Sequence, residues 1–91
     1  MMKNKEYVNG QKTYEQTGEK LTYFYKDGKV KAEGVSINGL MQGEWKFYRE
    51  SGQLWQIGNF RDNEKHGNWI RYDKLGNLEY DKTFIKGKIK K

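Results

Sequence analysis

Hydrophobic positions recur along this chain at a fixed interval of 24 residues. The matching pairs are Trp45 and Trp69, Tyr48 and Tyr72, Leu54 and Leu78, and Phe60 and Phe84. The glycines Gly28, Gly52 and Gly76 follow the same interval. An interval of this length is typical of a repeat array, in which stacked units bury the apolar surface that one unit leaves exposed.

Each unit contains two polar-apolar alternating runs on either side of a turn dipeptide, which is the usual signal for a β-hairpin. The chain has no proline to interrupt a strand, and no stretch has helical periodicity. We therefore predict an all-β fold, in which six or seven antiparallel strands form a meander and a single elongated twisted sheet. The expected strands are 21–25 and 29–36 around Asp27-Gly28, 45–48 and 53–60 around Ser51-Gly52, and 69–72 and 77–85 around Leu75-Gly76, with a further short strand at 12–16.

The length of 91 residues fits one domain made of three repeats. We place these repeats at residues 19–42, 43–66 and 67–91. Residues 1–18 form an irregular lead-in or a degenerate capping repeat, because Gly10 falls in step with Gly34 and Gly58. Terminal repeats are often atypical, since they close the array.

The two faces of the sheet follow from the assumption that each hairpin turns on two residues. Leu21 then lies opposite Gly34, Trp45 opposite Gly58, and Trp69 opposite Lys82. The first face collects Leu21, Tyr23, Ala32, Trp45, Phe47, Leu54, Phe60, Trp69, Leu78, Tyr80 and Phe84, and is the better core. The second face collects Phe24, Lys31, Lys46, Tyr48, Trp55, Ile57, Ile70, Tyr72, Glu79 and Asp81. A change of one residue in turn length would exchange some of these positions.

The second face carries an apolar stripe that the core does not need. Exposed tyrosine and tryptophan side chains mark interfaces, because they supply a large contact area at low entropic cost. We predict a partner-binding site made of Tyr48, Trp55, Ile57, Ile70 and Tyr72, with Lys46 and Arg71 as orienting charges. The alternative is that the sheet curls and buries this face instead.

Residues that could carry catalysis or bind a metal are scarce. The chain has no cysteine and a single histidine, His66, which we expect in a solvated loop. Glu79 and Asp81 are expected to share a face, where an acidic pair protects a sheet edge against aggregation. The glycines recur at turn positions and form no phosphate-binding loop. We expect no enzyme activity, no metal and no cofactor.

The net charge of +6 favours an acidic partner, which could be a protein, an anionic membrane or a nucleic acid. Basic residues at positions 46, 49, 61, 65 and 71 alternate with acidic residues at 44, 50, 62, 64 and 73, so the sequence shows no continuous basic stripe. The lysine-rich tail, residues 86–91, is expected to be solvated. No apolar run has the length of a membrane span or a signal peptide, and the cytoplasm is the expected compartment.

Two of the units resemble a known repeat family. They read G-E-W-K-F-Y-R-E-S-G-Q-L from Gly43 and G-N-W-I-R-Y-D-K-L-G-N-L from Gly67, and are similar to the MORN-repeat variant of bacterial YwqK-like antitoxin proteins. The first unit departs from this pattern at Glu19, Leu21 and Phe24. The resemblance implies a sheet of β-hairpins whose repeated residues are structural, and a binding scaffold without an active site.

We therefore expect a non-catalytic protein-binding module. Its most concrete form is an antitoxin-like protein that occludes an acidic partner such as a toxin, with Tyr48, Trp55 and Tyr72 as anchors. One alternative is a binder of anionic lipid or single-stranded nucleic acid. Another is an architectural protein that forms a homo-oligomer through the open edge of the strand at 77–85.

Overall fold

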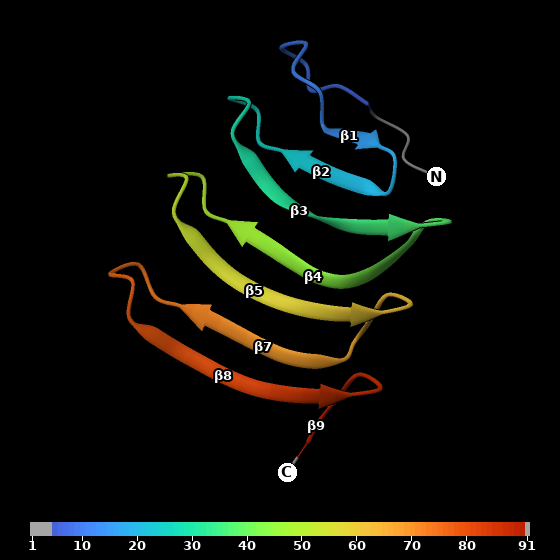
Figure 1. Ribbon diagram of the computed structural model, residues 1–91. Coiled ribbons are helices and arrows are strands. Elements are labelled where there is room, and N and C mark those ends of the chain that lie inside the picture. Colours follow the sequence, from blue (N-terminus) through green and yellow to red (C-terminus); the bar gives the residue numbers. More distant parts are fainter. Residues whose placement is uncertain (1–4, 91) are drawn as a thin grey trace.

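A computed structural model describes residues 5–90, which form one open antiparallel sheet (Figure 1). The strands are β1 (Tyr14–Thr17), β2 (Lys20–Phe24), β3 (Val30–Ile37), β4 (Leu40–Tyr48), β5 (Leu54–Arg61), β6 (Glu64–Lys65), β7 (Gly67–Tyr72), β8 (Leu78–Ile85) and β9 (Lys88–Ile89). Their order in the sheet is β1-β2-β3-β4-β5-β7-β8-β9, and β6 pairs with β5. The predicted all-β meander is confirmed. The strand number exceeds our prediction because of the two-residue strands β6 and β9. Residues 1–4 and Lys91, which belong to the predicted lead-in and lysine tail, lie outside the described residues.

The connections between repeats are tight two-residue turns. Both central residues have positive φ at Asn38-Gly39 (52° and 81°), at Asp62-Asn63 (50° and 71°) and at Lys86-Gly87 (50° and 83°). Two consecutive positive φ angles define the type I′ turn, whose twist matches that of the adjoining strands. These turns lie along the edge of the molecule opposite the hairpin turns in Figure 1.

The turns within the repeats are longer than predicted. In the first, the Tyr25 N–H donates to the Lys29 carbonyl at 2.8 Å and the Gly28 N–H to the Tyr25 carbonyl at 3.0 Å. Gly28 has a φ of 90°, whereas Asp27 is not among the residues with positive φ, so Asp27-Gly28 is not a type I′ turn. The second and third hairpins repeat this geometry from Arg49 and from Asp73. The prediction of two-residue hairpin turns is therefore wrong.

A bulge next to each hairpin turn shifts the strand register by one residue, between Tyr23 and Phe24 in the first repeat. In the second and third repeats, Tyr48 pairs with Leu54 and Tyr72 with Leu78. Leu54 and Leu78 therefore lie on the second face, and their assignment to the first face is corrected. Further from the turns the predicted pairs of Leu21 with Gly34, Trp45 with Gly58, and Trp69 with Lys82 are confirmed.

The core lies on the first face, as predicted. The buried hydrophobic residues of the described chain, Leu21, Ala32, Trp45, Trp69 and Phe84, all belong to it. Aromatic contacts run across the strands through these positions, including the Trp45–Phe47 and Phe47–Trp69 pairs at 6.3 and 6.0 Å between ring centroids. This aromatic row holds together a sheet that has no second layer.

Two glycines make room for the tryptophan rings. A Cβ atom on Gly34 would lie under 3.0 Å from the Trp45 ring, and one on Gly58 would lie equally close to the Trp69 ring. Although Trp45 lies opposite Gly58 in the strand register, its ring leans over Gly34 on the other side. Each indole N–H then reaches a backbone carbonyl, from Trp45 to Val35 at 2.9 Å and from Trp69 to Asn59 at 2.8 Å.

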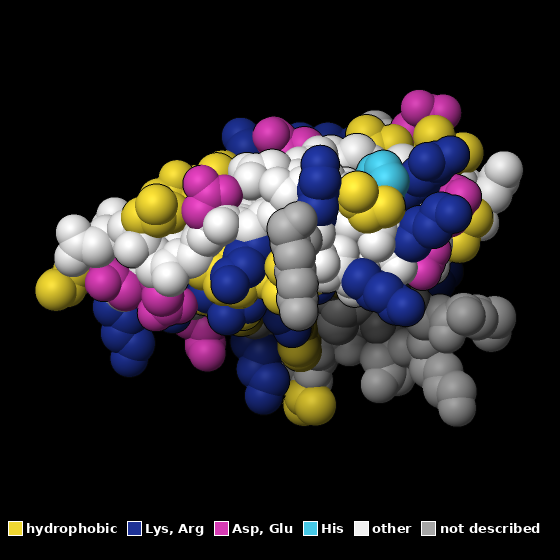
Figure 2. Space-filling view, turned by 90° about the horizontal axis from the view of Figure 1, so that it is seen from below, with side chains coloured by type: hydrophobic (Ala, Val, Ile, Leu, Met, Phe, Trp, Pro, Cys, Tyr) yellow, Lys and Arg dark blue, Asp and Glu magenta, His cyan; other side chains and the backbone are white. Residues whose placement is uncertain are grey.

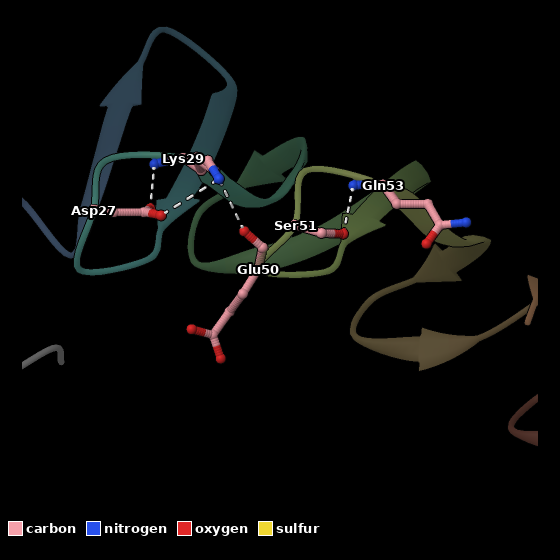
Figure 3. Close-up of polar contacts among 5 residues, drawn as sticks. All are labelled: Asp27, Lys29, Glu50, Ser51 and Gln53. Atoms are coloured by element: carbon pink, nitrogen blue, oxygen red, sulfur yellow. Dashed lines mark hydrogen bonds and ion pairs between the residues drawn. The ribbon is translucent and has the colours of Figure 1, made fainter. Parts of the chain in front are cut away.

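Side chains of each hairpin turn donate to the backbone of the next turn. The Tyr25 hydroxyl donates to the Tyr48 carbonyl at 2.7 Å, and the Arg49 Nη2 donates to the Tyr72 carbonyl at 3.0 Å. The Lys29 Nζ reaches the Glu50 carbonyl at 3.3 Å (Figure 3). These bonds form a ladder that joins successive repeats at their turns.

The lead-in supplies the first step of this ladder. Its turn has the hydrogen bonds of the hairpin turns, with the Tyr7 N–H donating to the Gln11 carbonyl at 2.7 Å and Gly10 at a φ of 89°. The Tyr7 hydroxyl donates to the Phe24 carbonyl at 2.7 Å. Gly10 therefore corresponds to Gly28, and not to Gly34 as the 24-residue interval predicted.

Candidate functional site

The residues predicted to bind a partner do not share one face. Lys46, Ile57 and Ile70 are cross-strand neighbours in one row of the second face. Tyr48 lies two residues beyond Lys46, and Tyr72 two residues beyond Ile70, so both tyrosines lie on the same face. These five residues are brought together by strands β4, β5 and β7.

Trp55 and Arg71 lie on the opposite, first face. Arg71 pairs with Gln56 and with Tyr80, in the row that contains Ala32 and Phe47. Its Nε and Nη2 both donate to the Gln56 Oε1, at 3.0 and 2.9 Å. Its guanidinium carbon is 5.2 Å from the centre of the Trp55 ring. Trp55 is the bulged residue of β5, and the bulge turns its side chain toward Arg71. The placement of Trp55 on the second face is corrected.

The second face carries a contiguous apolar surface, which we call the second-face stripe. It comprises Tyr48, Leu54, Ile57, Ile70, Tyr72 and Leu78. All are partly exposed, and Leu78 is 60% exposed. Leu54 and Leu78 were missed by sequence reasoning, because only the bulge places them here. The stripe is apolar surface that the sheet itself leaves uncovered.

Charges of both signs border the second-face stripe. The Tyr48 hydroxyl donates to the Glu33 Oε2 at 2.9 Å, and Lys20 Nζ lies 3.3 Å from the other Glu33 oxygen. The Tyr48 bond is the main cause that lowers the pKa of Glu33, while burial is the main cause that raises the pKa of Tyr48. Lys46 and Asp81 lie in the same row as Ile57 and Ile70.

The first face carries cations that lie on aromatic rings. The Arg49 guanidinium carbon is 5.7 Å from the centre of the Trp55 ring, and that of Arg71 is 5.2 Å from the Tyr80 ring as well. Lys65 Nζ lies 4.7 Å from the Trp69 ring. Beside Trp55, residues of the first three hairpin turns line an open groove of about 610 Å³. They are Tyr25, Arg49, Glu50, Ser51, Gln53, Trp55 and Lys74.

The side chains that could take part in catalysis do not come together in one site. His66 lies in the connection between β6 and β7, is partly buried, and its Nδ1 accepts from the Lys86 N–H at 3.5 Å. Asp81 accepts from Asn68 Nδ2 at 2.8 Å on the second face. Glu79 is the bulged residue of β8, equivalent to Trp55, so the expectation that it shares a face with Asp81 is corrected. Within residues 5–90, no group of three or more His, Asp or Glu side chains could hold a metal ion.

Two further observations concern membranes. None of the residues in the described part belongs to a helix long and apolar enough to cross a bilayer. In the lysine-rich tail, Lys86, Lys88 and Lys90 are exposed, and the Lys90 N–H donates to the Thr83 carbonyl at 2.7 Å. The tail therefore continues the sheet edge through β9.

Comparison with known proteins identifies two of the repeats. The sequence model of the MORN repeat variant matches residues 41–62 and 65–86, which contain the second and third hairpins. Repeats of this family are generally non-catalytic modules that bind proteins or membranes. No curated protein and no solved structure matches the chain.

Proposed function

We propose that this chain, with its two adjacent MORN-variant repeats, is a non-catalytic module that binds a protein partner on the second-face stripe. The observation that carries the proposal is the position of the stripe. The core occupies the first face, and the apolar side chains of the second face stay partly exposed, with no second layer over them. A contiguous apolar surface with a polar border is typical of protein–protein interfaces.

The charges beside the stripe favour a protein over a phosphate-bearing ligand. Lys20 and Lys46 alternate with Glu33 and Asp81, so this face has no excess of positive charge. Nucleic acid and anionic lipid both require such an excess, because their affinity comes mainly from cations placed against phosphates. A protein surface can match charges of both signs.

The mechanism is occlusion. Tyr48 and Tyr72 act as anchors, since each presents a ring beside a leucine from the paired strand, Leu54 or Leu78. Lys46 orients an acidic group of the partner at the edge of the stripe. An antitoxin-like protein that covers a toxin is one form of this function.

Assembly through the edge of β8 is less favoured. Within the described residues, β9 covers Phe84 and Ile85, and the edge from Leu78 to Asp81 is open. In a dimer formed around a two-fold axis perpendicular to the sheet, both faces of the sheet are continuous across the contact. Each residue of β8 therefore lies opposite a residue of the same face in the second copy. Two of the three central registers then place like charges opposite each other, Asp81 against Asp81 or Lys82 against Lys82, and the third places Tyr80 against Tyr80. Figure 2, which views this end of the stack, shows side chains of both signs and only small, separate hydrophobic groups.

The test compares two leucines of the third hairpin. Leu78 lies in the stripe and is 60% exposed, whereas Leu75 lies at the tip of the turn and is 86% exposed. Leu78→Lys and Leu75→Lys add the same charge at exposed positions, so both variants should fold. The tagged protein is used to capture partners from cells, with washes at low and high salt, and each captured protein is identified and bound again in purified form.

We expect a purified partner that is retained at high salt, released by Leu78→Lys and held by Leu75→Lys. Two results contradict the proposal. One is loss of all partners at high salt, which indicates a phosphate-bearing ligand. The other is equal retention by the two variants, which places the contact away from the stripe.

A further inference from the structure

The first face carries a cluster of positive charges that is not apparent in the sequence, where basic and acidic residues alternate. Arg49, Lys65, Arg71 and Lys82 each lie over one or two aromatic rings, at 4.7 to 5.8 Å from the ring centroids. Lys65 pairs with Phe60, and Lys82 with Trp69, both in rows of the first face. We call these four cations and their rings, Trp55, Trp69, Tyr80 and Phe84, the basic aromatic face.

The cations of the basic aromatic face have no acidic partner. The ion pairs in residues 5–90 are Lys12–Glu15, Lys20–Glu33 and Lys29–Asp27, all elsewhere. The fold places most of the acidic residues that alternate with these cations in the sequence away from the basic aromatic face. Glu44 and Glu64 pair with Asn59 and Arg61 on the second face.

The other three alternating acids lie in turns. Asp62 is in a connecting turn, while Glu50 and Asp73 are in hairpin turns. Two acids stay close to the cations. They are Glu79, the bulged residue of β8, and Glu50, which lines the groove beside Arg49 and Trp55. The sheet therefore separates charges that the sequence mixes, and leaves an excess of positive charge on one face.

We propose that the basic aromatic face binds a single-stranded nucleic acid. Proteins that hold single strands without sequence preference combine cations along the phosphate chain with rings on which bases stack. Here Phe47, Phe60 and Tyr80 are partly exposed beside the cations. An arginine that lies over a ring, as the Arg71 guanidinium does at 5.2 Å from the centre of the Trp55 ring, can also stack against a base.

The shape of this face favours a flexible strand over a bilayer. The charged groups lie over aromatic rings, and the groove of about 610 Å³ beside Trp55 extends along the first three hairpin turns. A flexible strand can follow a groove, whereas a bilayer meets a protein as a plane. The proposal is independent of the protein partner, because it uses the opposite face of the sheet.

The test is fluorescence anisotropy with a labelled oligothymidylate of about 15 nucleotides, a length within the range that small single-strand binding domains cover. Affinity is measured as a function of salt. With four cations on phosphates, the slope of log K against log salt should be about −3. Lys82→Gln should reduce the size of that slope by about 0.7.

The matched control is Lys46→Gln, which removes the same charge from the second face. Lys46 and Lys82 are both exposed residues in strand positions, so both variants should fold. We expect Lys46→Gln to leave the slope and the affinity unchanged. Equal loss in the two variants overturns the proposal, since it indicates attraction by net charge alone. Absence of saturable binding to the oligonucleotide, or binding only to vesicles of phosphatidylserine and phosphatidylcholine, also overturns it.

Discussion

The contact between Gly58 and Trp69 gives the sharpest test of how this sheet is held together. Gly58 is buried, and an added Cβ would meet the Trp69 ring at under 3.0 Å. Trp69 is 2% exposed, its N–H donates to Asn59, and its ring packs edge-on against Phe60 at 5.1 Å between centroids. In Gly58→Ala the ring has to leave this position, because the backbone on the other side of the collision cannot move freely.

The expected cost follows from what the ring loses. Overpacking a core position costs about 1–3 kcal/mol. Loss of the indole hydrogen bond and of the edge-on ring pair adds about 1 kcal/mol each when complete. We therefore expect Gly58→Ala to destabilise the protein by about 3 kcal/mol, which lowers Tm by about 12–24 °C in a domain of this size.

The measurement is thermal and urea denaturation, followed by circular dichroism and tryptophan fluorescence. Gly76→Ala is the control, since nothing lies within 4 Å of its Cβ position and its φ of 86° should cost about 1 kcal/mol. A double-mutant cycle isolates the collision, because Gly58→Ala should cost almost nothing in a Trp69→Ala background. The reasoning is refuted if Gly58→Ala costs less than Gly76→Ala, or costs the same with and without the ring.

Four further outcomes are expected. The folded state lowers the pKa of Glu33, so its carboxylate stabilises the protein at neutral pH. This stability is lost as the pH falls below about 4.3 and through the folded pKa. Glu33→Gln should therefore reduce the fall of Tm between about pH 7 and pH 3. Burial raises the pKa of Tyr23, Tyr25 and Tyr48, so their neutral forms stabilise the protein, and this stability is lost as the pH rises above about 10. Alkaline titration followed by tyrosine absorbance should show midpoints above that value. Tyr25→Phe removes the bond to the Tyr48 carbonyl and should cost about 1 kcal/mol in urea denaturation, whereas no loss would show that the ladder is not stabilising. Sedimentation should find a monomer that Asp81→Val converts toward a dimer, and a wild-type dimer would contradict the argument from like charges.

The sequence predicted the features that depend on periodicity. The interval of 24 residues placed the strands, and alternation within them placed Trp45, Trp69 and Phe84 in the core. These predictions succeed because side chains alternate strictly in an unbroken strand. One correct cross-strand pair therefore determines the face of every other residue in the two strands.

The predictions failed where alternation breaks. Asp27-Gly28 has the composition of a two-residue turn, but the chain uses a longer loop with a bulge, and the type I′ turns fall at the connections instead. The bulge moves Leu54 to the second face and Trp55 to the first, so the predicted partner site was divided between two surfaces. Composition alone does not distinguish the two kinds of turn, because both draw on glycine, asparagine and aspartate, and both place glycine or asparagine in the left-handed region.

The ladder of bonds at the hairpin turns also gives the array a direction. Tyr7, Tyr25 and Arg49 all donate forward, to the hairpin that follows. At the equivalent position the third hairpin has Asp73, whose Oδ1 accepts from its own turn at Leu75 and Asn77. A carboxylate offers no forward donor at neutral pH. A protein engineer who adds a hairpin after the third one should therefore first change Asp73 to arginine or tyrosine, so that the new turn receives the same side-chain hydrogen bond.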